Sequence, residues 1–486
     1  MMRSILIIAA MILPGPAFAE TTSWYRFLLE NGQSIGTGRQ DVTTSRDGRQ
    51  ITASHQIRVK EEGNVLTVMT ERTRRSENLA GQTIAIDQVS HTGRDEVHSS
   101  VAIQGPAATL VATLVRQTRF DRQTRRIALP AGVRFDMGGG LLASWDPVKT
   151  PKLEFENFSI AAQGVEHIVL QARADRSPDP EGRITIVRQS YDGPNLRAVA
   201  ELILDKNHQL VETRQPMFGT SIRIETTDQA TASKPTPAFS MIRNAFVKSP
   251  FRILQPALSG HIRYIFRFKD NASFPLPQTG EQRVTMGPDQ VTLDICPRCT
   301  PETPATAPEL EAARQPSLWM QSESPVLQKM AAPIRAKAIP DAEKMNLLAK
   351  RARLSLRTMD FSGHYSALEA IARHGGDCTE DAVVLAALGR AAGIPTRVAS
   401  GLVYSREDYH GVSNVFMPHS WTLAWIDGRW QSFDMSIPGF DATHIALTIG
   451  EGDAKSIFAA SQLASLLQWE KMIQIKAAQK AAAETQ

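Results

Sequence analysis

The residues with the clearest capacity for chemistry surround Cys378, in the segment His374-Gly375-Gly376-Asp377-Cys378-Thr379-Glu380. The two glycines indicate the end of one helix. Asp377, followed three positions later by Glu380, has the capping-box pattern of a helix start. Cys378 is therefore predicted at the first position of a helix over residues 378–392. The positive end of a helix dipole lies at that position and favours the thiolate, the nucleophilic form of cysteine.

Negative charges near this cysteine act in the opposite direction. Asp377, Glu380 and Asp381 are all close to the thiol in sequence. The helix dipole alone therefore does not secure a thiolate, and a nucleophilic Cys378 requires a histidine as its base. The other interpretation is that Cys378 is an inert, small residue of the core.

A candidate histidine and carboxylate lie on a predicted hairpin further along the chain. The run from His419 to Ile426 has the pattern of a strand, and Asp427-Gly428 is a strong signal for a two-residue turn. The return strand then runs from Arg429 to Asp434. Ile426 opposite Arg429 fixes the register of the whole pair.

This register places Trp421 opposite Asp434. Since strand side chains alternate between faces, His419 and Asp434 share a face as diagonal neighbours, about 7 to 8 Å apart at their backbones. Asp434 can then orient the imidazole and stabilise its charged form, as the third group of a catalytic triad. A three-residue turn would move Asp434 to the other face. The alternative is an ordinary strand histidine beside an ordinary strand-end acid.

The chain has three cysteines, which is an odd number. Cys296 and Cys299 are close enough in sequence to form a local disulfide, and Cys378 then keeps a free thiol. A thioredoxin-like redox role needs a helix after Cys296, which the prolines in 300–304 disfavour. Two cysteines are also too few for a closed zinc site. We expect a structural disulfide rather than a redox or metal role, and predict no metal site.

The elements that position these residues fall into three regions. Period-two runs separated by turn residues predict an antiparallel β domain over 20–228, with hairpins that pair 56–60 with 65–70 and 201–204 with 209–213. It is interpreted as a packed β core, the alternative being a curved sheet that holds a lipid or peptide. A polar linker over 228–237 precedes a small β module over 238–300, with a strand at 261–268 and a hairpin of 284–286 with 291–295.

The pattern changes to helical spacing near residue 318. Helices are predicted at 325–336, 341–354, 364–374 and 378–392, followed by the strands that carry His419 and Asp434. This defines an α+β domain over 316–452, and a C-terminal helix over 454–486 follows it. The predicted fold class is thus multidomain, with β domains first, then an α+β domain, then the final helix.

The N-terminus indicates export. A basic start, an apolar run from Ile5 to Leu13 and the Ala17-Phe18-Ala19 pattern are typical of a signal peptide over 1–19, cleaved after Ala19. No later apolar run reaches the ~18 residues of a membrane span. We therefore expect a periplasmic or secreted protein without a transmembrane segment. The net charge of +4 is spread along the chain and predicts no nucleic-acid partner.

The residues around the predicted site resemble the transglutaminase-like superfamily in its bacterial form. The resemblance rests on Gly376-Asp377-Cys378, on residues 385–397 with Gly401-Leu402-Val403-Tyr404, on His419-Ser420-Trp421 and on residues 430–434. It covers about 316–452. It implies a papain-like fold with Cys378 as the thiolate, His419 as general base and acid, and Asp434 as the orienting group. It also implies that Trp421 walls the substrate site.

These observations predict a thiol enzyme that attacks an amide or ester carbonyl. It would form a thioester on Cys378 and pass the acyl group to water or to an amine, without a cofactor. The expected substrate is a peptide, a protein or a cell-envelope amide. The competing hypothesis is an inert transglutaminase-like scaffold or a ligand-binding protein of the cell envelope.

Overall fold

The computed structural model describes residues 20–475 apart from 61–65, 93–94, 107, 136–138, 143, 174–178, 194, 218–219, 240–245, 250–251, 270–271, 301–304, 359–363, 407–411 and 438. The predicted signal peptide over 1–19 and residues 476–486 of the predicted C-terminal helix lie outside this part. The chain divides into two compact units. The first comprises Met1–Ala245, Met359–Arg373 and Asp453–Ser465, and the second comprises Phe246–Thr358, His374–Gly452 and Leu466–Gln486.

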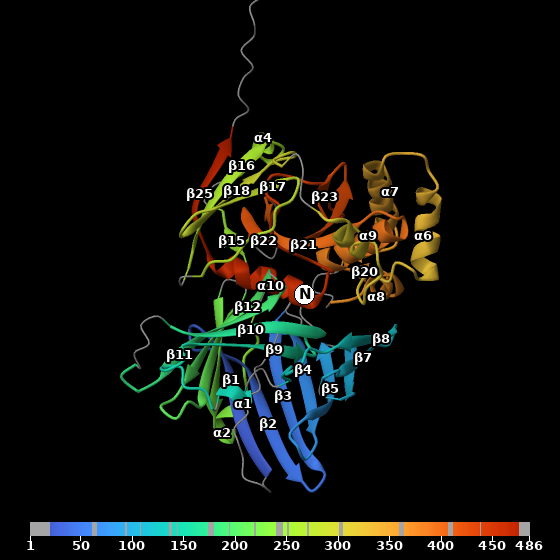
Figure 1. Ribbon diagram of the computed structural model, residues 1–486. Helices are drawn as coiled ribbons and strands as arrows, with labels where there is room; N and C mark the ends of the chain where they lie inside the picture. Colours follow the sequence, from blue (N-terminus) through green and yellow to red (C-terminus); the bar gives the residue numbers. More distant parts are fainter. Residues whose placement is uncertain are drawn as a thin grey trace, which may run out of the picture. The chain divides into compact units, whose positions relative to one another are not determined.

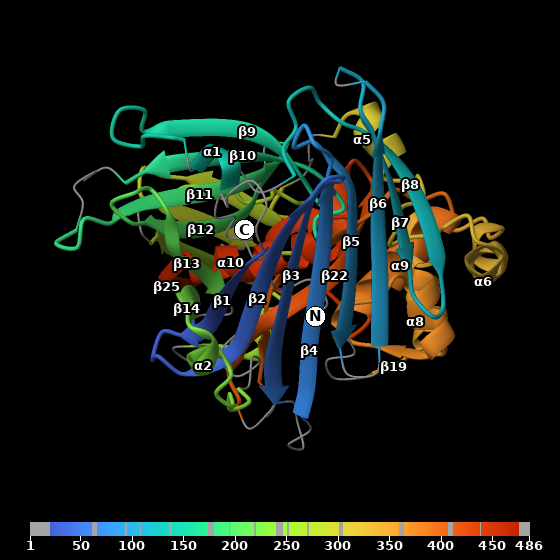
Figure 2. The ribbon, with the colours of Figure 1, turned by 90° about the horizontal axis from the view of Figure 1, so that it is seen from below.

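The first unit is built on one sheet of 14 strands, in the order β8-β7-β6-β5-β4-β3-β2-β1-β14-β13-β12-β11-β10-β9. All neighbours in this order are antiparallel, and Figures 1 and 2 show the strands curving round. The strands are β1 (Glu20–Leu29), β2 (Ser34–Ser45), β3 (Gly48–Lys60), β4 (Leu66–Glu77), β5 (Thr83–Thr92), β6 (Asp95–Gln104), β7 (Val111–Gln117), β8 (Arg122–Ala128), β9 (Lys152–Ser159), β10 (Gly164–Ala172), β11 (Ile184–Asp192), β12 (Asn195–Leu204), β13 (Leu210–Met217) and β14 (Thr220–Thr227).

The antiparallel β domain predicted from the sequence is confirmed. The pairing of β3 with β4 and of β12 with β13 reproduces both predicted hairpins. Burial alternates along β10 and β11, so every second side chain packs in the core. One core cluster forms around Phe27 and Ile224, and another around Ile168 and Leu202.

The helices that the described residues of the first unit form are α1 (Gly139–Leu142), α2 (Gln229–Ala232), α8 (Ala367–Arg373) and α10 (Ala454–Ser465). The last two come from the C-terminal half of the chain. α8 is fixed by a buried pair in which Arg116 donates to Glu369 at 3.2 and 3.3 Å. α10 packs on β12, where the backbone N–H of Val199 donates to Gln462 at 3.0 Å.

In the described residues, the second unit contains two larger sheets and the two-stranded sheet of β19 (Arg357–Thr358) and β20 (Gly375–Gly376). One of the larger sheets has the strand order β15-β22-β21-β24, with β23 paired to β22, and the other has the order β17-β18-β16-β25. Their strands are β15 (Val247–Lys248), β16 (His261–Phe268), β17 (Gln282–Met286), β18 (Gln290–Ile295), β21 (Thr396–Ser405), β22 (Val415–Ile426), β23 (Arg429–Phe433), β24 (Ile445–Gly450) and β25 (Leu467–Ile475). β16 and the β17–β18 hairpin match the strands predicted for the small β module.

The helices of this unit are α4 (Gln255–Leu258), α5 (Ala307–Ala312), α6 (Pro325–Arg335), α7 (Asp341–Arg353) and α9 (Cys378–Ala391). α9 packs against β21 and β22, and α6 and α7 pack against α9 (Figure 1). The predicted helices over 325–336, 341–354 and 378–392 therefore exist within a residue or two of their predicted ends.

Two details differ from the expectations. The helix before Cys378 ends at Arg373, and His374 takes the left-handed backbone (φ 54°) instead of a glycine. Gly375–Gly376 form the short strand β20, which pairs in parallel with β19 (Arg357–Thr358). The predicted C-terminal helix begins at Ala454 but ends at Ser465, because the chain then continues as β25 along β16.

Candidate active site

Cys378 is the first residue of α9, where the sequence places it. Asp377 is the N-cap, and its carboxylate accepts from the backbone N–H of Thr379 at 2.8 Å. The Glu380 carboxylate accepts from the backbone N–H of Asp377 at 2.9 Å and completes the predicted capping box. Gly376 makes this possible, since a Cβ there would lie 2.3 Å from the Cβ of Glu380.

α9 holds the cysteine on a buried support. Every residue from Thr379 to Ala391 except Asp381 is buried. The Thr422 hydroxyl of β22 donates to the carbonyl of Ala382 at 2.8 Å, which joins the first turn of α9 to the strand of His419. Hydrogen bonding from the backbone N–H of Ser420, next to His419, acts to lower the pKa of the Cys378 thiol. The start of α9 is therefore joined to the strand that carries His419.

The hairpin of β22 and β23 has the predicted register. Ile426 pairs with Arg429, and Thr422 pairs with Phe433. Asp427 and Gly428 have positive φ angles of 51° and 78°, as a two-residue turn of this kind requires. The structure brings His419 and Asp434 together, with 2.6 Å between His419 Nε2 and Asp434 Oδ2.

A second histidine, which the sequence analysis did not select, meets the same carboxylate. His444 Nε2 lies 3.1 Å from Asp434 Oδ2, and His444 Nδ1 lies 3.2 Å from Asp441 Oδ1. His444 precedes β24. Gly401 on β21 pairs with His419 on β22 on one side and with Ala446 on β24 on the other. This pairing brings the residues just before β24, and so His444, near His419, and it is the signal that could reveal His444.

The charges of this cluster follow from its contacts. Burial alone would raise the pKa of the Asp434 carboxyl, but the two imidazoles outweigh burial, and this pKa lies well below its usual range. Burial alone would lower the pKa of His444, but Asp434 and Asp441 outweigh it and raise this pKa to about 10. At neutral pH, Asp434 is therefore a carboxylate and His444 an imidazolium.

The ionised Asp434 also sets the proton position on His419. A carboxylate only accepts hydrogen bonds, so His419 Nε2 carries the proton of this contact, and the neutral form of the imidazole then has its lone pair on Nδ1. The lone pair of Nδ1 is what a general base uses. The second oxygen of the carboxylate is held as well, since Asp434 Oδ1 accepts from the backbone N–H groups of Ser436 and Ile437 at 2.7 and 3.0 Å.

A buried acid from the small β module supports the hairpin from another side. Glu281 is 6% exposed, and both of its oxygens accept from the backbone N–H of Ser432, at 2.9 and 3.0 Å. The Ser432 hydroxyl donates to Glu281 at 2.7 Å and accepts from the Trp421 indole at 3.1 Å. Burial raises the pKa of Glu281 to about 7, although the hydrogen bonds from Ser432 oppose this.

Trp421 lies against both histidines. Its ring stacks on His419 at 6.1 Å and meets His444 edge-on at 5.1 Å. The side chain is 2% exposed. Trp421 thus supports the imidazoles from within the core, and its contact with substrate remains a prediction.

The thiol of Cys378 is protonated at rest. Burial raises its pKa well above the ordinary value, and the carboxylate of Asp377 raises it further, while the N–H of Ser420 opposes them. The expectation that acids at the helix start disfavour the thiolate agrees with this direction. The side chain nevertheless keeps some exposed surface. A nearby base is therefore needed to generate the nucleophile.

The ring nitrogens of His419 and His444 and an oxygen of Asp434 lie within 4.8 Å of one another, which is also a spacing found around metal ions. Their separations of 2.6 and 3.1 Å are hydrogen-bond distances. Two ligands on one zinc ion, each bonded at about 2 Å in a tetrahedron, would stand further apart than 2.6 Å. The geometry fits a hydrogen-bonded cluster.

The other two cysteines form a disulfide, with their Cα atoms 5.2 Å apart. It lies directly after β18, and the carbonyl of Pro297 within it accepts from Arg429 of β23 at 3.2 Å. Cys378 is the free cysteine of the chain. None of the helices in the described residues is long and apolar enough to cross a membrane.

Residues 328–435 match the model of the transglutaminase-like superfamily. This stretch contains α9, the β22–β23 hairpin and the three residues Cys378, His419 and Asp434. The second unit thus carries a transglutaminase-like domain. No curated protein matches the chain.

Three solved structures show distant similarity. A candidate cysteine protease from Cytophaga hutchinsonii is 17% identical, with a TM-score of 0.25 over 44% of this chain and 84% of that one. A barrel-like protein of unknown function from Brucella abortus is 14% identical, with a TM-score of 0.32 over 44% and 99%. A candidate protease from Parabacteroides distasonis is 11% identical, with a TM-score of 0.19 over 70% and 64%. At these TM-scores none of the three carries an argument about this chain.

Proposed function

We propose that this protein is an exported thiol enzyme that transfers or hydrolyses the acyl group of an amide or ester. Cys378 is the nucleophile, His419 the general base and acid, and Asp434 the orienting carboxylate. The observation that carries the proposal is the position of Cys378 at the start of α9, which Thr422 joins at 2.8 Å to the strand of a histidine that lies 2.6 Å from a buried carboxylate. A purely structural role seldom needs a free thiol at a helix start together with a buried histidine–carboxylate pair on the adjoining strands.

The reaction begins with proton transfer. As a carbonyl group approaches, the Cys378 thiol gives its proton to Nδ1 of His419, and the sulfur attacks the carbonyl carbon. The tetrahedral intermediate then collapses. The bond to the leaving amine or alcohol breaks, and His419 returns its proton to that leaving group. The acyl group remains on Cys378 as a thioester.

The second half repeats these steps with a new nucleophile. Water or an amine gives a proton to His419 and attacks the thioester carbonyl, and the sulfur leaves and recovers its proton. In each half His419 is transiently an imidazolium. Asp434 stabilises that cation through the Nε2 hydrogen bond, and the indole of Trp421 stacks on the ring at 6.1 Å and keeps its orientation.

The test measures Cys378 reactivity and turnover together. The alkylation rate of Cys378 by iodoacetamide is followed from pH 5 to 9 in the wild type and in His419→Ala, with Cys378→Ser as blank. The matched control is His91→Ala, since His91 is a 46% exposed histidine of the first unit. Hydrolysis of a model thiol-reactive ester such as p-nitrophenyl acetate is measured on the same proteins.

We expect His419→Ala to slow alkylation at neutral pH and to abolish ester turnover, while His91→Ala leaves both unchanged. Equal rates in wild type and His419→Ala would remove His419 as the base and favour the inert scaffold. Turnover of peptide and cell-envelope amides by the active protein then narrows the substrate. Export is tested separately: the N-terminal sequence of the protein recovered outside the cytoplasm should begin at Glu20.

A further inference from the structure

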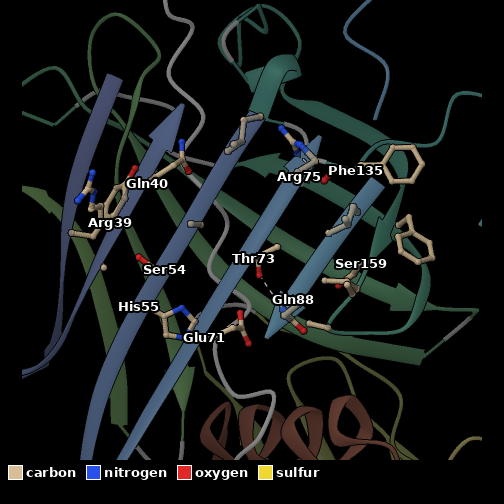
Figure 3. Close-up of a pocket in the computed structure, with 18 of the residues that line it drawn as sticks. Arg39, Gln40, Ser54, His55, Glu71, Thr73, Arg75, Gln88, Phe135 and Ser159 are labelled. Atoms are coloured by element: carbon tan, nitrogen blue, oxygen red, sulfur yellow. Dashed lines mark hydrogen bonds between the residues drawn. The ribbon is translucent and has the colours of Figure 1, made fainter. Parts of the chain in front are cut away.

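The first unit has a cavity on one face of its sheet. It measures about 130 Å³ and is lined by residues of β1 to β5, by Phe135 and by residues 158–161. Figure 3 shows its polar lining residues along neighbouring strands, with Phe135 and Ser159 on the side opposite Arg39. The volume is close to that of an engineered protein cavity, about 150 Å³, that takes up one benzene molecule.

The strand register explains the hollow. One row across the sheet pairs Gln40 with Ala53, Ala53 with Thr73, and Thr73 with Gln88. The next row pairs Gly38 with His55. Small side chains in the middle of these rows leave space that the larger groups at the sides do not fill. Phe135 and Phe158, with ring centres 5.9 Å apart, also line this space.

His55 and Glu71 are directly opposite each other on β3 and β4, and both line the cavity (Figure 3). Each keeps some exposed surface, but the surrounding protein still shifts its pKa. Burial lowers the pKa of His55 to about 4, so His55 is uncharged at neutral pH. Burial also raises the pKa of Glu71 to about 8, with a hydrogen bond from Gln88 opposing it.

The other charged groups of the lining already have partners. Arg75 pairs with Glu77 at 3.0 Å and donates to the carbonyl of Phe135 at 2.8 Å. Arg39 pairs with Asp41 at 2.7 Å. The remaining titratable side chain is Tyr25, whose pKa burial raises to about 12. Among the described residues of the lining, Glu71 is therefore the one acid, and no ion pair joins it to a basic side chain.

We propose that this cavity binds a small organic cation, an ammonium group on an apolar body the size of one aromatic ring, with Glu71 as its counter-ion. A cation beside Glu71 supplies the missing opposite charge and keeps the carboxylate ionised. The ring of Phe27, 5.9 Å from His55, and the ring of Tyr25 are available to the ammonium group and its apolar body. Gln88 and Thr73, joined at 3.2 Å, supply polar atoms at the same end.

Isothermal titration calorimetry of the mature protein with three probes of one shape tests the proposal. Benzylamine carries the cation, benzyl alcohol is neutral and benzoate is anionic. We expect benzylamine to bind with a dissociation constant below about 1 mM, and at least tenfold more tightly than the other two. Since Glu71 is mostly protonated at pH 7, the bound amine should release close to one proton, measured by comparing buffers of different ionisation enthalpy.

Three variants make the result specific. Glu71→Gln should lose the preference for benzylamine and the proton release. Glu96→Gln, at a 61% exposed acid of the same sheet, should keep both. Ala53→Leu should block binding by filling the cavity while circular dichroism shows an intact fold. Equal binding of benzyl alcohol or benzoate, a preference for benzylamine that survives in Glu71→Gln, binding that survives in Ala53→Leu, or no benzylamine binding at 10 mM (about ten times the expected constant) would overturn the proposal.

Discussion

Replacing His444 by glutamine should destabilise the protein in a manner that depends on pH. The substitution removes a buried imidazolium from between Asp434 and Asp441, which are 3.1 and 3.2 Å from its nitrogens. Glutamine keeps polar atoms at the position but carries no charge. The two buried carboxylates then lose the cation that they share, and removing one partner of a buried ion pair costs about 3–5 kcal/mol.

The pKa gives the size and the direction of the effect. Because the pKa of His444 rises from 6.5 in the unfolded chain to about 10 in the folded one, its stabilisation is complete below pH 6.5. It is then lost as the pH rises through 10. The linkage relation gives about 4 kcal/mol at pH 7 and about 1 kcal/mol at pH 9.5. The free energy of unfolding of His444→Gln should therefore approach that of the wild type as the solution becomes alkaline.

Urea unfolding at pH 7 and pH 9.5, followed by tryptophan fluorescence, measures this. Trp421, Trp425 and Trp430 lie on β22 and β23, in the unit that contains His444, whereas Trp24 and Trp145 add a signal from the first unit. His91→Gln, at an exposed histidine, is the matched control and should change little at either pH. A loss of stability in His444→Gln that is equal at the two pH values would refute a pKa of about 10 for His444 in the folded chain.

Three further outcomes are expected. Glu281→Gln should gain stability relative to the wild type as the pH rises from 5 to 8, by at most about 3 kcal/mol in urea unfolding. The reason is that the pKa of Glu281 is raised from 4.5 to about 7, so the wild type must ionise a buried acid over this range. A constant difference between the two proteins from pH 5 to 8 would contradict the raised pKa. Gly401→Ala should lower the free energy of unfolding by more than about 2 kcal/mol, since its Cβ would lie 1.8 Å from the carbonyl oxygen of Ile445. A melting temperature within about a degree of the wild type would contradict this and would mean that β21 and β24 separate easily. Peptide mapping without reduction should find Cys296 linked to Cys299 and a free thiol at Cys378; a linkage of Cys378 to either of the others would rule it out as the nucleophile.

The parts of the site that rest on local chemistry could be predicted from the sequence. The capping box of Asp377 and Glu380 involves groups three residues apart, and the β22–β23 register follows from a two-residue turn. Both features place a side chain to within a few ångströms. The positions of Cys378, His419 and Asp434 could therefore be inferred before any long-range contact was known.

The groups missed by the sequence analysis depend on distant pairings. His444 reaches Asp434 because β24 pairs with β21, and Glu281 reaches Ser432 across 151 residues. The division into units has the same origin. Arg116 and Glu369, 253 residues apart, place α8 in the first unit although it precedes Cys378 in sequence. No local pattern encodes such contacts, because each needs the completed sheet to bring its partners together.

The acids around Cys378 also bear on how long the protein survives chemical stress. Peroxide attacks the thiolate far faster than the thiol, and the first product, a sulfenic acid, leads on to irreversible sulfinic and sulfonic acids. Asp377 caps α9 through the N–H of Thr379 and at the same time raises the pKa of the Cys378 thiol. One carboxylate thus fixes the helix start and keeps the sulfur in its oxidation-resistant form. We expect Asp377→Asn, which retains a capping side chain, to leave the fold intact and to shorten the lifetime of the free thiol in dilute hydrogen peroxide.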